Sequence, residues 1–325
     1  MLIGGIMEHV EEAGVHSGDS ACVLPPQTLS PETLTVIADY TRRIATALEV
    51  VGLVNVQYAV KAGQVFVIEA NPRASRTVPF VAKATGVPLA KVAARVMVGA
   101  SLADLRAEGL VGPSGAAAPA YPGADGRLGH VSVKEAVLPF NRFPDADAVL
   151  GPEMRSTGEV MGIDAGVGRA FAKAQLAAGT RLPDSGAVFL SLADRDKATG
   201  LAAARRFIEL GFSLAATAGT AAHLRAAGLP VAIDVAKIGE DGTDAVDLIA
   251  GGEIDLVINS PRGRGPRADG AHIRAAAGVH QVPLLTTASA GLAAANGIAD
   301  RRQHEVQVRA LQDYHRAMHE AATDG

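Results

Sequence analysis

Glu69 and Asn71 are the residues whose types and spacing point most directly to chemistry. They lie in the run Val-Ile-Glu-Ala-Asn-Pro-Arg at residues 67–73. Side chains two apart on an extended strand share one face, so a carboxylate and an amide oxygen stand together just before a proline ends the strand. Such oxygen ligands suit Mg²⁺ or Mn²⁺ holding phosphates, and Arg73 and Arg76 beside them could neutralise phosphate charge. A solvated strand end fits the same spacing.

Gln57 is the predicted third ligand of this metal corner. Residues 53–60 and 65–69 are rich in β-forming residues and predict a hairpin. If residues 62–64 form its loop, Gln57 lies directly opposite Glu69, whereas a two-residue loop would place it on the other face. We therefore predict the three-residue loop.

Three further elements are predicted around the hairpin. Residues 2–7 are apolar and predict a buried strand that needs neighbours. Ser30 followed by a proline is typical of a helix start, and the apolar spacing predicts a helix over 31–49. Another helix is predicted over 88–98, ending at Gly99.

From residue 186 onward, short apolar strands alternate with helices, which predicts a parallel sheet covered on both faces. The predicted strands are 187–192, 213–216, 231–235, 256–259 and 283–286. The predicted helices are 197–210, 221–227, 245–250, 271–277 and 289–296, and the polar tail 300–325 is also predicted to be helical. Glycine- and proline-rich residues 108–131 predict a flexible segment, and 179–185 a linker. We expect three regions: 1–107, 108–185 as a connecting region, and 186–325.

Cationic and hydroxyl residues follow the predicted strands of the last region. Ligands of open parallel sheets bind beyond the carboxyl ends of the strands, and a helix start there favours anions. Each residue alone could be an ordinary loop residue, but together they indicate a phosphate-bearing ligand. They are Lys197, Thr217, Thr220, Lys237, Asn259, Arg262 and Arg264.

Several strings resemble the large subunit of carbamoyl phosphate synthetase. They occupy residues 13–20, 55–59, 68–80, 83–90 and 150–159, and the resemblance covers nearly the whole chain except 108–131, which looks like an insertion. The resemblance implies an α/β fold with two parts. The first is the C-terminal portion of an ATP-grasp domain, which is α+β with an antiparallel sheet. The second is a doubly wound parallel-sheet domain like methylglyoxal synthase.

The resemblance also assigns roles in the first region. It implies that Gln57, Glu69 and Asn71 bind Mg²⁺ or Mn²⁺ and that Arg76 holds the transferring phosphoryl group. Nucleotide contacts fall on Gly14, Val15, His16, Ser17, Gln57 and Glu69. In this family the site phosphorylates carbamate with ATP, so that bicarbonate and glutamine-derived ammonia give carbamoyl phosphate for pyrimidine and arginine biosynthesis. His16 could instead be a loop-packing histidine.

In the last region the resemblance implies an allosteric domain. In such enzymes UMP inhibits and IMP can activate by binding at this sheet edge. In many members ornithine activates by binding near the junction with the synthetase domain. The implied ribonucleotide contacts are Lys197, Thr217, Thr220, Lys237, Asn259 and Arg264. Pro261 stands where a small hydroxyl residue is common, which leaves the effector open. A methylglyoxal synthase activity is disfavoured, because residues 259–262 contain no carboxylate.

The sequence also predicts what the chain does alone. The glycine-rich lid, the basic residues that grip the phosphates and the adenine pocket are expected upstream of Met1, so we predict no carbamoyl phosphate synthesis by this chain alone. Expected partners are the remaining synthetase portion and the glutamine amidotransferase small subunit. A stand-alone nucleotide-sensing module without catalysis is the alternative.

Composition supports a globular chain. Of 325 residues, 48% are apolar and 20% charged, and the net charge of −4 gives no reason to expect nucleic acid as a partner. No apolar stretch suits a membrane span or a secretory signal, and the single cysteine excludes an intrachain disulfide. We expect the cytoplasm as the compartment.

Overall fold

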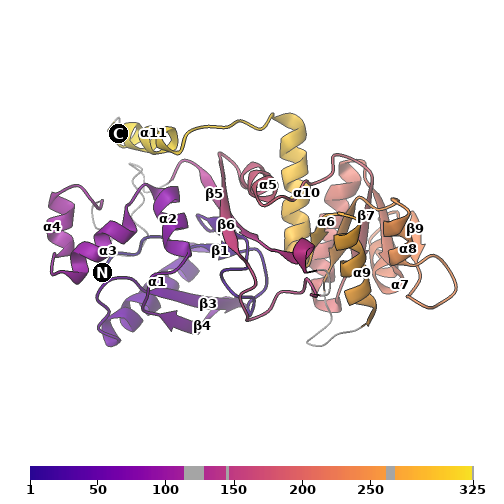
Figure 1. Cartoon of the computed structure of the whole chain (residues 1–325), viewed down its shortest axis with the longest axis horizontal. Helices are drawn as coiled ribbons and strands as arrows, with labels where there is room; N and C mark the ends of the chain where they lie inside the picture. The colour runs from indigo at the N-terminus through magenta and orange to yellow at the C-terminus, as the bar shows by residue number, and fades with distance from the viewer. Residues whose placement is uncertain (113–127, 144–145, 261–267, 324–325) are drawn as a thin grey trace.

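A computed structural model describes residues 1–112, 128–143, 146–260 and 268–323. It contains a four-stranded antiparallel sheet, a separate two-stranded hairpin and a five-stranded parallel sheet (Figure 1). The predicted α/β class, with an antiparallel part followed by a parallel one, is confirmed. Within these described residues, no helix is long and apolar enough to cross a membrane.

The antiparallel sheet has the strand order β1-β2-β5-β6. Its strands are β1 (Glu8–His9), β2 (Cys22–Leu24), β5 (Val131–Val137) and β6 (Gly158–Asp164). Two strands come from region 1–107 and two from region 108–185, so the sheet joins the two regions. The boundaries between the three regions stay predictions. Of the predicted flexible segment 108–131, residues 113–127 lie outside the described part.

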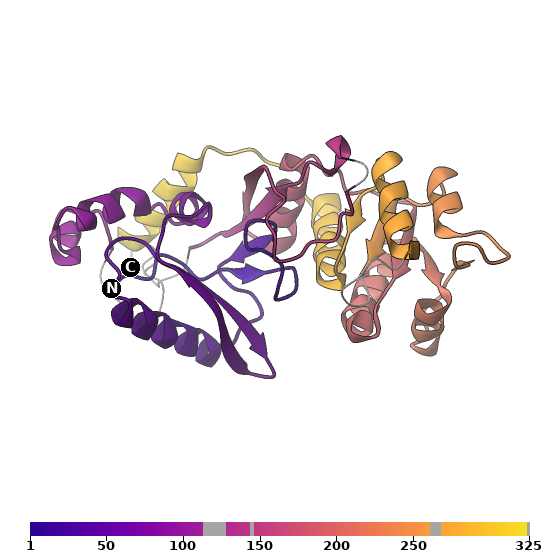
Figure 2. The same ribbon diagram turned by 60° about the horizontal axis from the view of Figure 1, so that its bottom comes forward.

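Helices surround this sheet and the hairpin. They are α1 (Pro31–Ala47), α2 (Thr77–Thr85), α3 (Leu89–Met97), α4 (Leu102–Ala107) and α5 (Val167–Ala177). The predicted start of α1 is confirmed, because the Ser30 hydroxyl accepts a hydrogen bond from the Thr33 N–H at 3.3 Å and Pro31 opens the helix. The Tyr58 hydroxyl lies 2.8 Å from that of Thr41, which docks the hairpin on α1 (Figure 2).

The prediction of a strand over residues 2–7 was wrong. The chain enters the sheet only at Glu8, and the preceding residues form no strand. Their apolar side chains pack against helices instead: Leu2 contacts the cluster of Val92 and Leu105, and Met7 contacts the cluster of Phe80. Burial against α2, α3 and α4 thus replaces strand pairing.

The hairpin pairs β3 (Asn55–Lys61) with β4 (Gln64–Asn71), and its predicted three-residue loop was wrong. Lys61 pairs with Gln64, so the loop has two residues, Ala62 and Gly63, both with positive φ (48° and 76°). Such turns match the twist of the flanking strands. Tyr58 pairs with Val67 and Gln57 with Glu69, which leaves Ile68 as the extra residue of a β-bulge. The predicted opposition of Gln57 and Glu69 is therefore confirmed by a different route.

The parallel sheet has the strand order β11-β10-β7-β8-β9, as expected for a doubly wound domain. Its strands are β7 (Ala187–Ser191), β8 (Ser213–Thr217), β9 (Ile233–Val235), β10 (Leu256–Asn259) and β11 (Leu284–Leu285). Its helices are α6 (Lys197–Glu209), α7 (Ala218–Ala226), α8 (Ala245–Ala250), α9 (Ala268–Val279) and α10 (Ala288–Gln303). Each predicted element of this region has its counterpart, with ends shifted by a few residues.

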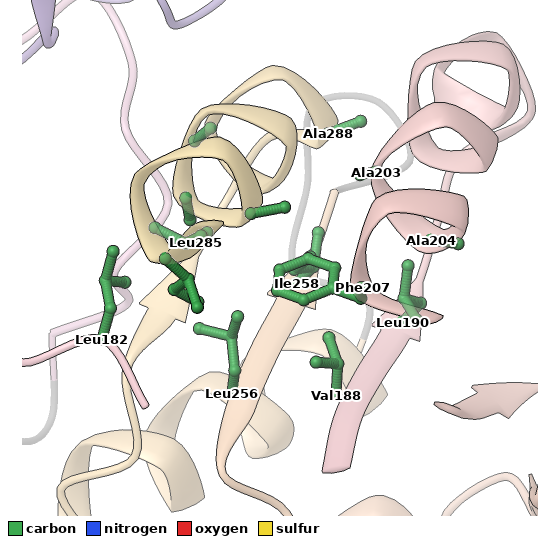
Figure 3. Packing of buried hydrophobic residues seen from close by; sticks show 14 of the residues in the cluster. Leu182, Val188, Leu190, Ala203, Ala204, Phe207, Leu256, Ile258, Leu285 and Ala288 are labelled. Atoms are coloured by element: carbon green, nitrogen blue, oxygen red, sulfur yellow. The ribbon is translucent and has the colours of Figure 1, made fainter. Parts of the chain in front are cut away.

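Both faces of the parallel sheet are buried. Val188, Leu190, Leu256 and Ile258 point to one face, where Phe207 and the alanines of α6 and α10 cover them (Figure 3). The residues between them belong to a second cluster with α8 and α9. This alternation explains why the strands are continuously apolar.

The chain ends in α11 (Leu311–Thr323), which returns to the first part of the molecule (Figure 1). The Tyr314 hydroxyl donates to the Ile163 carbonyl at 3.2 Å, and a ring nitrogen of His315 lies 2.7 Å from the Lys83 carbonyl. Met318 is buried in the cluster of Leu24 and Phe80. The predicted helical tail 300–325 is therefore confirmed over 300–303 and 311–323 but not over 304–310, and α11 packs on the first part of the chain.

Candidate nucleotide and effector sites

One face of the hairpin carries four polar side chains. Gln57 lies opposite Glu69 and Asn55 opposite Asn71, and residues two apart on each strand share that face. The Asn71 amide donates to Glu69 Oε1 at 3.0 Å, and the Asn55 amide lies 3.4 Å from the hydroxyl of Thr77. Gln57, Glu69 and Asn71 are thus brought together as predicted, while Asn55 was not among the predicted residues.

The predicted nucleotide contacts, residues 14–17, belong to a loop over 14–18 that lies against this hairpin. The Gln57 amide donates to the Val15 carbonyl at 3.5 Å, across 42 positions of sequence. Gly14 has φ +106°, a conformation that favours glycine. His16 Nδ1 accepts from the Gly18 N–H at 3.0 Å, so one ring nitrogen has a partner within the loop itself. The nucleotide-binding role of His16 stays a prediction.

Arg76 lies just before α2 and is tied to the same loop through Ser156. Its NH1 donates to the Ser156 carbonyl at 3.2 Å and lies 3.1 Å from the Ser156 hydroxyl, which donates to the Gly18 carbonyl at 3.0 Å. Asp19, which is 1% exposed, accepts hydrogen bonds from the N–H groups of Arg155 and Ser156. Asp19 and Ser156 were not predicted as site residues, although both lie in strings that carry the resemblance.

Ionisable groups are buried beneath the loop, and sequence reasoning did not single them out. Lys134 is fully buried, donates to the Ser17 carbonyl at 2.9 Å and lies 3.5 Å from Glu159. Burial, followed by the neighbouring Glu135, raises the pKa of Glu11 to about 8. Burial also raises the pKa of Glu135 to about 7. The only sequence signal was the pair Lys134 and Glu135 within β5, whose other residues are apolar or small.

A cavity of about 890 Å³ opens beside the loop and the hairpin. Its polar lining includes Glu11, Ser17, Asn55 and Gln57, and apolar residues of the N-terminal segment, α1, β3 and α3 supply much of the rest. The cavity is large enough for a ligand and borders Asn55 and Gln57 of the polar face, whereas Glu69 and Asn71 do not line it.

The residues of the hairpin fit a hard divalent cation. Gln57, Glu69 and Asn71 offer amide and carboxylate oxygens from two adjacent strands, a donor set that Mg²⁺ and Mn²⁺ prefer. No group of three or more His, Cys, Asp or Glu side chains that could hold a metal occurs in the described part of the chain. A metal here therefore depends on the two amide side chains as well as Glu69.

The carboxyl edge of the parallel sheet gathers part of the predicted effector set. The Thr220 hydroxyl accepts from the Leu192 N–H at 3.1 Å and lies 3.3 Å from that of Thr217, which joins the ends of β7 and β8. The Ser260 hydroxyl accepts from the Ala193 N–H at 2.8 Å, which joins the end of β10 to the same edge.

The other predicted effector residues have ion-pair or hydrogen-bond partners or lie outside the described residues. Lys197 lies 2.8 Å from Asp194, and Lys237 lies 2.9 Å from Glu240. Asn259, which is 3% exposed, accepts from Arg274 at 2.6 Å. Arg264 falls outside the described residues, as do Pro261 and Arg262. Arg274 was not predicted, because α9 gave no sign of a polar role.

Comparison with protein families finds two matches. Residues 3–105 match the family described as carbamoyl-phosphate synthase L chain, ATP binding domain. Residues 200–286 match the MGS-like domain family. The two matches fall on the antiparallel and parallel parts of the structure, respectively.

Comparison with curated proteins finds relatives along nearly the whole chain. The carbamoyl phosphate synthase large chain of Rubrobacter xylanophilus is 53% identical over 318 residues, which cover 98% of this chain and 29% of that protein. The large chain of Mycobacterium tuberculosis is 51% identical over 329 residues, 98% of this chain and 29% of the relative. The large chain of Archaeoglobus fulgidus is 50% identical over 316 residues, which cover 97% of this chain and 28% of that protein. The chain thus spans less than a third of the length of these relatives.

Proposed function

Because the chain belongs to the carbamoyl phosphate synthase large-chain family, as a C-terminal part of it, we propose that it supplies one wall of an ATP-dependent phosphorylating site and an effector domain. The observation that carries this proposal is two sets of hydrogen bonds that end on the same loop, residues 14–18. They join Gln57 to Val15, and Arg76 through Ser156 to Gly18. Residues predicted separately for metal, nucleotide and phosphoryl group thus border one site.

In this proposal Gln57, Glu69 and Asn71 hold Mg²⁺ or Mn²⁺. The metal, when bound, neutralises the charge of the ATP phosphates, and the protein's share is to position them. Residues 14–17 contact the nucleotide. Arg76 is held by two contacts to Ser156, so its guanidinium is oriented before a phosphoryl group arrives. Preorganised cations of this kind stabilise a transferring phosphoryl group.

The proposed substrates are ATP and carbamate, which give ADP and carbamoyl phosphate. We propose that the remaining synthetase portion forms carbamate from bicarbonate and ammonia, and that a glutamine amidotransferase small subunit supplies the ammonia. The structure supports the need for a further portion through the hairpin, which carries apolar side chains on its surface. Phe66 and Val67 are each 48% exposed and Ile68 is 45% exposed. A two-stranded hairpin with such a surface is typical of an interaction site.

We propose accordingly that this chain alone does not synthesise carbamoyl phosphate. The measurement is bicarbonate-dependent ATP hydrolysis by the purified chain, with and without the remaining synthetase portion. Hydrolysis is expected only after that portion is added. Bicarbonate-dependent hydrolysis by the chain alone would contradict this proposal.

The parallel sheet is proposed to bind a ribonucleotide effector such as UMP or IMP at its carboxyl edge. Thr217 opens α7, so its hydroxyl and the first N–H groups of the helix could bind a phosphate. Lys197, Thr220, Lys237, Asn259 and Arg264 complete the proposed set. For ornithine, the raised pKa values of Glu11 and Glu135 mark buried carboxyls near the junction that would suit a cationic effector.

Calorimetric titration of UMP into the full chain tests the effector proposal. Lys237→Ala removes a lysine whose side chain is 71% exposed, so the fold should tolerate it. We expect at least about tenfold weaker binding. Lys61→Ala, an exposed lysine of the hairpin, is the matched control and should bind UMP like the unsubstituted chain. Equal affinity of both variants would remove Lys237 from the site.

The second candidate is a stand-alone nucleotide sensor without catalysis. The observation that favours it is the core of the parallel sheet, which is complete on both faces. The synthetase-addition experiment separates the two functions. If UMP binds but the added synthetase portion restores no bicarbonate-dependent hydrolysis, the sensor is the better account.

A further inference from the structure

Arg274 of α9 joins the end of β10 to a segment of the connecting region. Its side chain is 5% exposed. NH1 donates to Asn259 Oδ1 at 2.6 Å, while Nε and NH2 donate to the two carboxylate oxygens of Asp147, also at 2.6 Å. This bidentate pairing fixes the direction of both side chains, which lie 127 positions apart in sequence.

Asp147 begins a run of contacts along residues 146–157, called the connector here. Its carbonyl accepts from Arg155 NH1 at 2.6 Å. The backbone N–H groups of Arg155 and Ser156 then donate to the two carboxylate oxygens of Asp19, at 2.7 and 2.9 Å. The Gly151 carbonyl accepts from the His16 N–H at 2.8 Å. The connector is therefore held at one end by α9 and at the other by the predicted nucleotide loop.

The connector ends on Arg76, because both contacts of Arg76 NH1 are to Ser156. A continuous series of hydrogen bonds and one short stretch of backbone thus runs from Asn259, through Arg274 and Asp147, to Arg76. Its ends belong to the two sites of the proposed function.

We propose that Asp147 and Arg274 are positioning residues that couple the effector edge of the parallel sheet to the placement of Ser156 and Arg76. An effector that binds Asn259 changes the hydrogen bonding of Arg274, and the connector carries that change to Arg76. What binds at each end rests on the proposed function. The link itself rests only on the contacts described above.

Gly270 shows how closely this link is packed. It precedes Arg274 by one helical turn, and an added Cβ would lie 2.9 Å from Arg274 NH1 and 3.6 Å from Asn259 Oδ1. Gly270→Ala therefore displaces the guanidinium without removing a charge. It provides a second variant that tests the link independently of Asp147→Asn.

Hydrogen–deuterium exchange on the full chain without ligand is the first test. Asp147→Asn should speed exchange in peptides covering 150–157 by at least about fivefold, because the connector loses its charged anchor. Asp234→Asn is the matched control, since Arg225 also binds that aspartate with two hydrogen bonds of 2.8 Å. It should leave 150–157 unchanged. Unchanged exchange there in Asp147→Asn would overturn the proposal. If that variant does not fold, the same criterion applies to Gly270→Ala.

Exchange with UMP added is the second test. In the unsubstituted chain UMP should slow exchange at 217–220 and at 150–157, and in Asp147→Asn only at 217–220. Slowing at 150–157 that persists in Asp147→Asn would overturn the coupling. If UMP slows exchange nowhere in the unsubstituted chain, the effector assignment of the proposed function fails, and the ligand-free test decides the link by itself.

Discussion

Gln57 of β3 and Glu69 of β4 are direct cross-strand partners, and Asn71 donates a hydrogen bond to the Glu69 carboxylate. The bulge at Ile68 sits immediately beside this pair. Because the three side chains share one face of the hairpin, they can act on one ion, and their substitutions should not behave independently.

Glu69→Gln is expected to weaken Mn²⁺ binding at least about tenfold, because the variant loses the only carboxylate of the donor set. Electron paramagnetic resonance of free Mn²⁺ measures this directly. Gln57→Ala should weaken binding too, and the double variant should lose less than the sum of the two. Glu305→Gln, which alters an exposed glutamate between α10 and α11, is the control. Additive effects would place the two residues on different ions or on none.

Lys134→Met should lower the free energy of unfolding by about 3 kcal/mol, because it leaves Glu159 without its buried partner. The Ser17 carbonyl loses its donor as well, which should loosen the predicted nucleotide loop. Urea denaturation measures the loss. Lys134→Met combined with Glu159→Gln should recover part of the stability, since the unpaired charge of Glu159 is then removed. A single variant as stable as the unsubstituted chain would show that the pair contributes nothing.

The free energy of unfolding should fall as pH rises through the window set by Glu135. Burial raises the pKa of this carboxyl from 4.5 to about 7, so the folded chain binds its proton more tightly than the unfolded chain. Stability from this group is complete below about pH 4.5 and is lost as pH rises through about 7.

Glu135→Gln should therefore flatten the pH profile of stability between pH 5 and 8 by about 2 kcal/mol. Burial lowers the pKa of His9 to about 4, which acts in the opposite direction, but this contribution is present in both proteins. The difference between their urea unfolding curves consequently reports Glu135 together with Glu11, whose raised pKa depends in part on Glu135. Parallel pH profiles for the two proteins would contradict the raised pKa.

Met318→Ala should cost about 2–4 kcal/mol, because Met318 is 4% exposed in the cluster that α11 forms with α2 and β2. Met97→Ala makes the same chemical change at a methionine that is 67% exposed, and should stay within about 0.5 kcal/mol. Urea denaturation compares the two. Equal effects would show that α11 does not dock on the first part of the molecule in solution.

The parallel sheet could be predicted because its information is local. Each strand is a short apolar run followed by a helical pattern, and that alternation by itself implies parallel strands covered on both faces. The start of α1 at Ser30 and Pro31 was equally local. Residues 2–7 show the limit of such reasoning, since an apolar run indicates burial without saying whether strands or helices provide it.

The hairpin lies between these cases. Its strands were predictable from composition, but the bulge at Ile68 and the two-residue loop compensate for each other in the register. Sequence alone thus determined that Gln57 and Glu69 could meet. Only the tertiary structure decided how they do.

The buried polar contacts between distant parts of the chain depended on the tertiary structure alone. Arg274 and Asp147 are 127 positions apart, and the Lys134 ammonium is 117 positions from the Ser17 carbonyl that it binds. Neither lysine nor arginine stands in a pattern that indicates burial, because charged side chains are usually exposed. Sequence therefore determined the architecture and the residue types at each candidate site, through periodicities that act over a few residues. Which charged groups are buried together was decided by long-range packing, for which a single sequence carries no periodic signal.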